Sequence, residues 1–421
     1  MTTTPFTSRH AMTRRRLLGA ALAAGATGAA APLALARPAW AADGATTPGT
    51  TTPGTTTPAA TTATGGPARL TLPEPTGPHP VGTVPLHLLD ASRPDPLAGP
   101  GRFRELMASV WYPAREAGEH PLAPWMADGA LRAFLADTGF AIDPALAPLT
   151  SGRVGAPVHR AGRRLPVVVY SHGAHSHRAD HTVMVQELAS HGYVVVTVDH
   201  TRDAITEFPD GLVLTPDRSV PMGPKDFAAD IRFLLDQVDA LAAGRNPDVD
   251  GRPLPAGLLH ALDPDRIGMF GWSKGGTATA YTMLTDRRVR AGLSLDGPMQ
   301  PTITTDLDRP FMMMTAAFTR AGQPDVAEFW PHLRGWRLDV QAQGAVHVSY
   351  GDNQVLIPQA AKLLGLTDEQ VRGMIGTLDP ARAVKIQQAY PVAFFDLHLR
   401  HRASRLLDGP SAAFPEVTYL P

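Results

Sequence analysis

A serine near the middle of the chain lies in a pattern typical of nucleophiles. Residues 271–276 read Gly-Trp-Ser-Lys-Gly-Gly, which fits G-x-S-x-G, after the apolar run 267–270 and ahead of the helix-like segment 275–285. A serine on a tight strand-to-helix turn projects its hydroxyl above the sheet, and flanking glycines let neighbouring backbone approach. The start of the helix adds a dipole that favours a developing oxyanion. The pattern predicts Ser273 as a nucleophile for acyl transfer; the alternative is a glycine-rich turn in which the serine only caps a helix.

Partners for such a serine follow it in the chain. A serine hydroxyl needs a base, and the base needs a carboxylate that orients it. Asp296 closes the expected strand 291–296 at the sheet edge where α/β proteins place their sites, although the Gly-Pro that follows would equally favour a turn-forming aspartate. The residues alone leave that choice open. His347 lies in a loop between the last expected strand and a helix, and its rivals among the 16 histidines are His332, His398 and His401.

The segments that must position these residues alternate between strands and helices. Short apolar runs rich in β-branched residues predict about eight strands, at residues 81–90, 106–112, 166–171, 193–199, 266–271, 291–296, 310–315 and 336–341. Helical spacing of apolar residues predicts helices at residues 182–191, 225–243, 275–285, 353–364 and 380–400. The alternation predicts the α/β class, with a mostly parallel sheet covered by helices on both faces.

The composition excludes several classes of protein. The chain has 421 residues, a formal net charge of -1 and no cysteine. Binding of a nucleic-acid backbone needs a clustered basic excess, so the balanced charge argues against a nucleic acid as partner. Without cysteine the chain has no disulfide, no thiolate metal site and no cysteine nucleophile.

The N-terminal residues predict export. Residues 1–41 carry Arg14-Arg15-Arg16, then an Ala/Gly-rich apolar run and the small-x-small site Ala39-Trp40-Ala41, the order of a twin-arginine-type signal peptide. A membrane anchor is the alternative, but the run is only mildly hydrophobic, so we expect cleavage, no membrane span afterwards and a secreted or periplasmic bacterial protein. Residues 42–67, rich in Thr, Pro and Gly, predict a disordered linker ahead of a catalytic domain at 68–421. Removing residues 1–41 takes away five arginines and leaves 33 basic residues against 39 acidic ones, a net charge of -6.

One loop offers a different chemistry through five potential metal ligands, His172, His175, His177, Asp180 and His181. Their spacing comes within one residue of the H-x-H-x-D-H pattern of dinuclear zinc hydrolases. The extra residue redirects the last two side chains of the pattern, so we expect no catalytic metal. A metal-dependent hydrolase is the alternative that this loop supports.

Further motifs accompany the serine, the aspartate and the histidine: Val110-Trp111-Tyr112-Pro113, Tyr170-Ser171-His172-Gly173, Leu188-Ala189-Ser190-His191-Gly192-Tyr193, Arg266-Ile267-Gly268-Met269-Phe270-Gly271 and Ala345-Val346-His347-Val348-Ser349-Tyr350. With them, the chain resembles the secreted platelet-activating-factor acetylhydrolase-like (isoform II type) branch of the α/β-hydrolases, which includes bacterial esterases and lipases. The similarity runs from about residue 72 to residue 419, nearly all of the expected catalytic domain.

The resemblance implies an α/β-hydrolase fold and a complete set of catalytic residues. It implies Ser273 as nucleophile, Asp296 as orienting acid and His347 as base. It also implies an oxyanion hole made by the backbone N–H groups of Ala174 and Lys274, and no cofactor. On this basis the catalytic role of Asp296 is preferred to the turn.

Some positions depart from the family pattern or are left without a role. Trp272 stands where the family often has His, and Lys274 stands where the family is usually apolar. The Lys274 charge would attract an anionic substrate group or pair with a nearby carboxylate, and we expect the pairing because lysines are ordinarily solvated or paired. The resemblance places His172 ahead of the oxyanion loop and has His177 and His181 line the cleft or face solvent.

We therefore expect a secreted serine hydrolase of carboxylic esters, an esterase or lipase that works through an acyl-enzyme on small-molecule, lipid or polymer esters. A polyester hydrolase (cutinase or PET-type) and a serine amidase share this machinery and stay open as alternatives, as does a non-catalytic binding protein. Acyl-chain length depends on how residues 122–140 and 311–330 pack, which the sequence does not show, and no oligomeric state is predicted.

Overall fold

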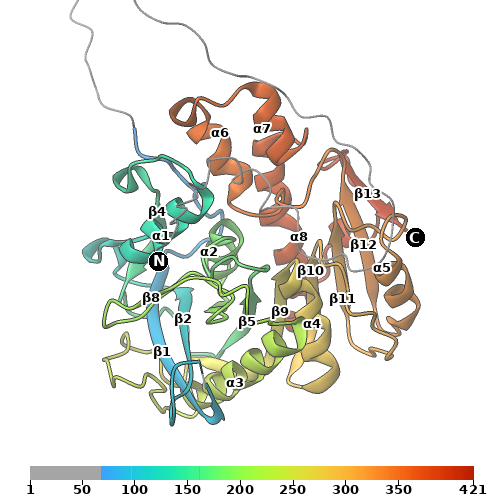
Figure 1. The fold of residues 1–421 in the computed structure, drawn as a ribbon. Helices are drawn as coiled ribbons and strands as arrows, with labels where there is room; N and C mark the ends of the chain where they lie inside the picture. The colour runs from blue at the N-terminus through green and yellow to red at the C-terminus, as the bar shows by residue number, and fades with distance from the viewer. Residues whose placement is uncertain (1–67, 96, 161) are drawn as a thin grey trace, which may run out of the picture. The chain divides into compact units, whose positions relative to one another are not determined.

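One sheet of 11 strands organises the part of the chain that the computed structural model describes, residues 68–95, 97–160 and 162–421 (Figure 1). Residues Arg69–Pro421 form one structural unit. The predicted signal peptide, residues 1–41, and the predicted linker, residues 42–67, lie outside the described residues. Within the described ranges, no helix is long and apolar enough to cross a membrane.

The sheet is mostly parallel, as the sequence predicts. From one edge to the other its strands are β13 (Val417–Leu420), β12 (Arg337–Ala342), β11 (Phe311–Thr315), β10 (Val289–Leu295), β9 (Leu262–Trp272), β5 (Leu165–Ser171), β6 (Val194–Asp199), β2 (Phe103–Pro113), β1 (Val81–Pro94), β4 (Leu149–Val154) and β3 (Leu122–Pro124). The strands from β12 to β6 pair in parallel, and β2 runs antiparallel to β6. The parallel strands therefore end at a common edge.

Three strands near the two ends of the sheet have no counterpart in the prediction of about eight. They are β13, β4 and β3, and the sequence of β4, Leu-Thr-Ser-Gly-Arg-Val, contains no continuous apolar run. A strand near an edge is not buried on both faces and does not need such a run, so its sequence carries a weak signal. The strand predicted at 291–296 ends one residue earlier as β10, and Asp296 follows it.

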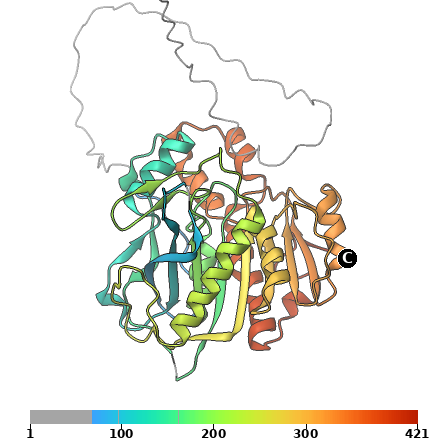
Figure 2. The ribbon, with the colours of Figure 1, turned by 60° about the horizontal axis from the view of Figure 1, so that its bottom comes forward.

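Helices cover both faces of the sheet. On one face pack α3 (Pro224–Ala242), α4 (Lys274–Thr285) and α5 (Pro324–Phe329), and on the other pack α2 (Thr182–Ser190) and α8 (Pro380–Arg400). Figure 2 shows α3 lying along the sheet. Side chains of β5 alternate between the two apolar clusters, with Val167 and Val169 in one and Val168 and Tyr170 in the other.

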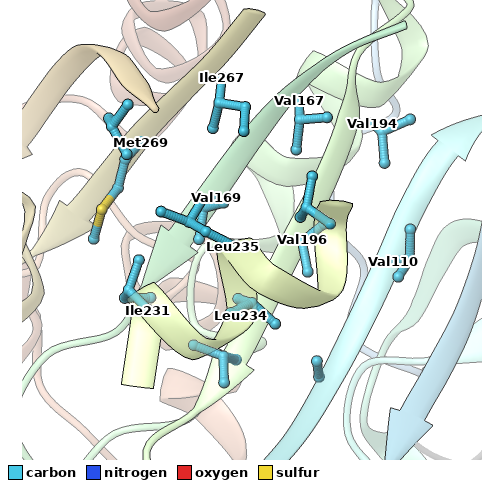
Figure 3. Packing of buried hydrophobic residues seen from close by; sticks show 14 of the residues in the cluster. Val110, Val167, Val169, Val194, Val196, Ile231, Leu234, Leu235, Ile267 and Met269 are labelled. Atoms are coloured by element: carbon cyan, nitrogen blue, oxygen red, sulfur yellow. The ribbon is translucent and has the colours of Figure 1, made fainter. Parts of the chain in front are cut away.

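The helix α3 shows how the apolar pattern builds the core. The apolar residues that recur along it at helical spacing are all buried: Phe227, Ile231, Leu234, Leu235, Val238 and Leu241. Figure 3 shows Ile231, Leu234 and Leu235 facing valines of β5 and β6. Each such side chain contributes roughly 1.5–3 kcal/mol by leaving water. This packing fixes α3 against the face of the parallel strands.

A third apolar cluster joins α1 (Asp128–Thr138) to α6 (Asn353–Leu364). A short hairpin contacts α1 and consists of β7 (Thr206–Glu207) and β8 (Val213–Leu214). In this contact the Glu207 carboxylate accepts a hydrogen bond of 2.9 Å from the Ala130 N–H. The helix α7 (Asp368–Ile375) follows α6, and short 3-10 helices lie at Ala117–Glu119, Pro144–Leu146, Trp330–His332 and Arg405–Leu407. The predicted bounds of α6 and α8 match the observed ones.

Candidate active site

Ser273 lies on a strained turn between β9 and α4, as predicted. Its φ is 55° and its ψ is -119°, a conformation that costs free energy for a residue with a side chain. A Cβ on Gly271 would lie 2.2 Å from the Gly275 carbonyl oxygen, and a Cβ on Gly275 would lie 2.0 Å from that of Ser171. Both glycines are therefore required by close backbone contacts, and the turn presents the Ser273 side chain at the carboxyl end of β9.

Asp296 directly follows the neighbouring strand β10, whose last residue Leu295 pairs with Trp272. Its carboxylate is fully buried and accepts backbone hydrogen bonds of 2.7, 3.1 and 2.8 Å from residues 316, 317 and 318. It also accepts a hydrogen bond of 2.6 Å from His347 Nδ1. The carboxylate thus binds groups far along the chain, which is the arrangement of an orienting acid.

His347 lies in the loop between β12 and α6, with its ring held on three sides. Because Asp296 is an acceptor, Nδ1 carries the proton and Nε2 is left as the basic nitrogen. The Trp272 indole N–H donates to the His347 carbonyl oxygen at 2.7 Å, and the two rings lie 4.9 Å apart. The Phe318 ring meets the imidazole edge-on at 5.1 Å. The His347 side chain is 24% exposed, so Nε2 is not sealed from a substrate.

The structure brings the three predicted catalytic side chains to one edge of the sheet. Ser273 follows β9, Asp296 follows β10 and His347 follows β12. In the described part of the chain, the His347–Asp296 bond is present, and no hydrogen bond joins the Ser273 hydroxyl to His347. Such bonds are often long before substrate binds.

The two predicted oxyanion donors lie on either side of the nucleophile. A Cβ on Gly173 would lie 2.5 Å from the Trp272 ring and 3.2 Å from Ser273 Cβ, so the loop that carries Ala174 runs directly beside the serine. Lys274 is the first residue of α4, where an N–H has no partner inside the helix. Among the described residues, neither the Ala174 N–H nor the Lys274 N–H has a hydrogen-bond partner.

The Lys274 side chain is paired, as expected. Its ammonium donates to Asp203 Oδ2 at 2.6 Å and to the Met222 carbonyl oxygen at 2.7 Å, and it lies 4.9 Å from the Phe227 ring centre. Asp203 has no motif around it that would have marked it in the sequence. The only available signal is its place just after β6, at the same edge of the sheet as the catalytic side chains.

The histidines of the 172–181 loop are engaged separately. His172 Nε2 accepts the His200 N–H at 3.0 Å and its Nδ1 donates to the Gly173 carbonyl oxygen at 2.6 Å. Burial lowers the pKa of His172 to about 4. His172 therefore acts as a neutral link between Gly173 and the segment that follows β6.

His177 and His181 do not face solvent, which excludes one of the two placements expected for these residues. Their exposed fractions are 3% and 2%. His177 is packed edge-on between the rings of Trp125 and Phe134, each 5.2 Å away. His181 Nδ1 contacts the Asp180 carboxylate at 2.9 Å. Among the described residues, no three His, Asp or Glu side chains converge in a way that could hold a metal ion.

A buried carboxylate that the sequence did not single out connects this loop to His347. Asp352 accepts hydrogen bonds of 3.0 Å from the N–H groups of Thr182 and Val183 at the start of α2, and one of 2.9 Å from Trp125 Nε1. Burial raises the pKa of Asp352 to about 6. The only signal in the sequence is its place five residues after His347. Asp352 anchors the end of the loop that carries His347.

Comparisons with known proteins agree on one family. The model of platelet-activating factor acetylhydrolase, isoform II, matches residues 65–208 and 254–407. The probable 1-alkyl-2-acetylglycerophosphocholine esterase of Arthroderma benhamiae is 28% identical over 278 residues, 62% of this chain and 68% of that protein. The platelet-activating factor acetylhydrolase of Bos taurus is 26% identical over 164 residues, 34% of this chain and 37% of that protein. A solved ferulic acid esterase from Streptomyces cinnamoneus superposes with a TM-score of 0.71 and 34% identity, over 84% of this chain and all of that one.

The fold class is the α/β-hydrolase class, a mostly parallel sheet with helices on both faces. The chain belongs to the platelet-activating factor acetylhydrolase, isoform II, family, which confirms the resemblance seen in the sequence. It is a serine hydrolase that acts on carboxylic ester bonds.

Proposed function

We propose that Ser273, His347 and Asp296 form a catalytic triad that hydrolyses carboxylic esters through an acyl-enzyme. The bond of 2.6 Å between His347 Nδ1 and the buried Asp296 carboxylate, beside the strained turn of Ser273, carries this proposal. Asp296 holds the Nδ1 proton in place, so Nε2 takes the Ser273 proton as Oγ attacks the ester carbonyl carbon. His347 then gives that proton to the leaving alkoxide. A water molecule, deprotonated in the same way, releases the acid and restores Ser273.

In this proposal, the N–H groups of Ala174 and Lys274 donate hydrogen bonds to the negatively charged oxygen of the tetrahedral intermediate. Their lack of partners among the described residues and the dipole of α4 support the assignment. A fixed donor of this kind contributes about 10²–10³-fold to kcat.

The aromatic rings beside His347 indicate which shape of acyl group the site would favour. Trp272 and Phe318 are both partly exposed and flank the imidazole. Flat apolar walls favour a planar acyl group, and the structural relative is named a ferulic acid esterase, whereas the sequence relatives are named for acetyl esters. We propose small-molecule or lipid esters with a short acyl chain as substrates, and aromatic acyl esters as a second candidate class.

The rates on a matched set of substrates test this function. Purified protein is assayed with p-nitrophenyl esters of increasing chain length, a feruloyl ester, an insoluble polyester and p-nitroacetanilide, alongside Ser273→Ala. We expect hydrolysis of the short or feruloyl esters, little cleavage of the anilide and loss of activity in Ser273→Ala. Hydrolysis of the anilide at rates above the esters would indicate an amidase, and activity retained by Ser273→Ala would contradict the mechanism.

We also propose that residues 1–41 direct twin-arginine export and that residues 42–67 link the mature N-terminus to the catalytic domain. The order of arginines, apolar run and cleavage site supports the export, and the Thr/Pro/Gly composition supports the linker. N-terminal sequencing of the extracellular protein should begin at Ala42. A protein that keeps Arg14-Arg15-Arg16 outside the cytoplasm would contradict cleavage.

A further inference from the structure

Lys274 and Asp203 form a buried pair against the nucleophile turn. The Lys274 side chain is 16% exposed and that of Asp203 is 3% exposed, and Nζ lies 2.6 Å from Oδ2. The ammonium also binds the Met222 carbonyl oxygen at 2.7 Å. Asp203 and Met222 lie near the two ends of the segment that connects β6 to α3. The Lys274 ammonium therefore binds both ends of that segment to the turn that carries Ser273.

The second oxygen of Asp203 reaches the opposite wall of the site. Asp203 Oδ1 accepts a hydrogen bond of 2.7 Å from the His175 N–H. Two residues further along, the Ile205 N–H donates to the Ser176 carbonyl oxygen at 3.0 Å. Two hydrogen bonds therefore join the segment after β6 to the loop that carries Ala174.

We propose that Asp203, through its pair with Lys274, is a positioning residue that holds the two halves of the oxyanion hole at a fixed separation. The proposal rests on the function proposed above. One carboxylate binds the residue next to Ala174 with one oxygen and the side chain of Lys274 with the other. Each N–H donor thus lies within one residue of a group that Asp203 fixes.

The backbone on both sides of the carboxylate needs such support. His175 has a φ of 59° and Ser273 a φ of 55°, both in the left-handed region that residues with side chains rarely occupy. Strained conformations persist only where surrounding contacts hold them. An oxyanion donor that moves by a fraction of an ångström loses its bond to the transition state while leaving substrate binding nearly unchanged.

A positioning role differs from a direct effect of the Lys274 charge on the oxyanion. If the free charge of Lys274 stabilised the oxyanion, Asp203→Asn would remove the neutralising partner and raise kcat. If the pair positions the donors, Asp203→Asn and Lys274→Met both lower kcat, since either one breaks the bridge. Lys274→Arg keeps the cation and should recover part of the activity lost in Lys274→Met.

The test compares kcat, KM and the affinity for a trifluoromethyl ketone, which mimics the tetrahedral intermediate, across these variants. We expect Asp203→Asn and Lys274→Met each to lower kcat by about 10–100-fold with KM within threefold, with the inhibitor weakened in proportion to kcat/KM. The double variant should lose little more than either single variant because the bridge is already broken.

Arg400→Met is the matched control. Arg400 also binds a carboxylate, that of Asp396 at 3.0 Å, together with the carbonyl oxygens of His191 and Gly192 and the Tyr193 ring, but at the end of α8. We expect it to lower stability without changing kcat. Three outcomes would each overturn the proposal. They are a loss of kcat in Arg400→Met equal to that of the pair variants, an unchanged inhibitor affinity in the pair variants, and a kcat near or above that of wild type in Asp203→Asn.

Fluorophosphonate labelling of Ser273 is measured in every variant. Failure of wild type to label would overturn the catalytic triad, whereas labelling with unaltered kinetics in the pair variants would overturn only the bridge.

Discussion

Two regions of the molecule hold histidines next to carboxylates, and the two differ in how the imidazole rings are bonded and exposed. In the loop at 172–181, His172, His177 and His181 are buried and bonded or packed within the protein, whereas the His175 side chain is 27% exposed. In the loop after β12, His347 is partly exposed, and its only side-chain hydrogen bond among the described residues goes to Asp296. His347 combines a partly exposed ring with a hydrogen bond from Nδ1 to a fully buried carboxylate, and none of the four histidines in the 172–181 loop has both features.

This contrast shows why the spacing of histidines is a poor guide to chemistry. The first loop comes close to a zinc pattern, yet among the described residues its side chains do not converge on a point that could hold a metal ion. No spacing of histidines in the sequence marks His347, yet its ring is fixed by the Asp296 carboxylate and by the side-chain rings of Trp272 and Phe318. A histidine can act as a base where one nitrogen is held by an acceptor and the other is both unpartnered and within reach of a substrate, and the second nitrogen of His181 is unpartnered but buried.

The largest expected effect separates the two regions directly. His347→Ala should lower kcat/KM by about 10⁵-fold or more because Ser273 loses its base. His177→Phe, in the other loop, should stay within threefold of wild type. Steady-state kinetics on one short ester measure both, and comparable losses in the two variants would show that the regions are not functionally distinct.

A somewhat smaller loss is expected from the carboxylate that orients the base. Asp296→Asn keeps the size of the side chain but replaces the negatively charged acceptor of the Nδ1 proton, so the wrong tautomer of His347 becomes favoured. We expect kcat to fall by about 10²–10⁴-fold with little change in KM. Circular dichroism confirms that the variant is folded, and a loss below tenfold would argue against the orienting role.

Asp352 sharpens the comparison because it connects the two regions. Asp352→Ala leaves two N–H groups at the start of α2 and the Trp125 indole without their acceptor, which should lower the free energy of unfolding by about 2–4 kcal/mol. We expect kcat to fall less than tenfold, since Asp296 still holds His347. Urea unfolding and kinetics on the same preparation give both values. A loss of kcat as large as that of Asp296→Asn would place Asp352 in the catalytic machinery.

The smallest effect concerns pH. Burial lowers the pKa of His177 to about 4, so the folded protein keeps this ring neutral while the unfolded chain protonates it near pH 6.5. The stability that depends on the neutral ring is therefore present above pH 6.5 and is lost as the pH falls toward 4. His177→Phe should reduce the slope of unfolding free energy against pH in this window by up to about 1.4 kcal/mol per pH unit. Urea titrations at several pH values measure it, and an unchanged slope would contradict a neutral buried His177.

The sequence was sufficient for the α/β class and for the elements next to the site. The turn that carries Ser273 was predictable because glycines and an apolar strand surround it, whereas the residues alone left the role of Asp296 open and only the family resemblance favoured a catalytic one. Strands near the ends of the sheet were missed because they lack long apolar runs. Asp203 and Asp352 were missed because their roles depend on partners distant in the chain, which no local pattern records.

The central claim, that Ser273 is the nucleophile activated by His347, is tested most directly by mass spectrometry after treatment with a fluorophosphonate. The tryptic peptide 267–274 contains Ser273 as its only serine, so the adduct can be assigned to one residue. We predict rapid labelling of this peptide in wild type, none in Ser273→Ala and labelling slowed by about 10³-fold in His347→Ala. An adduct on another serine, or labelling as fast in His347→Ala as in wild type, would contradict the account.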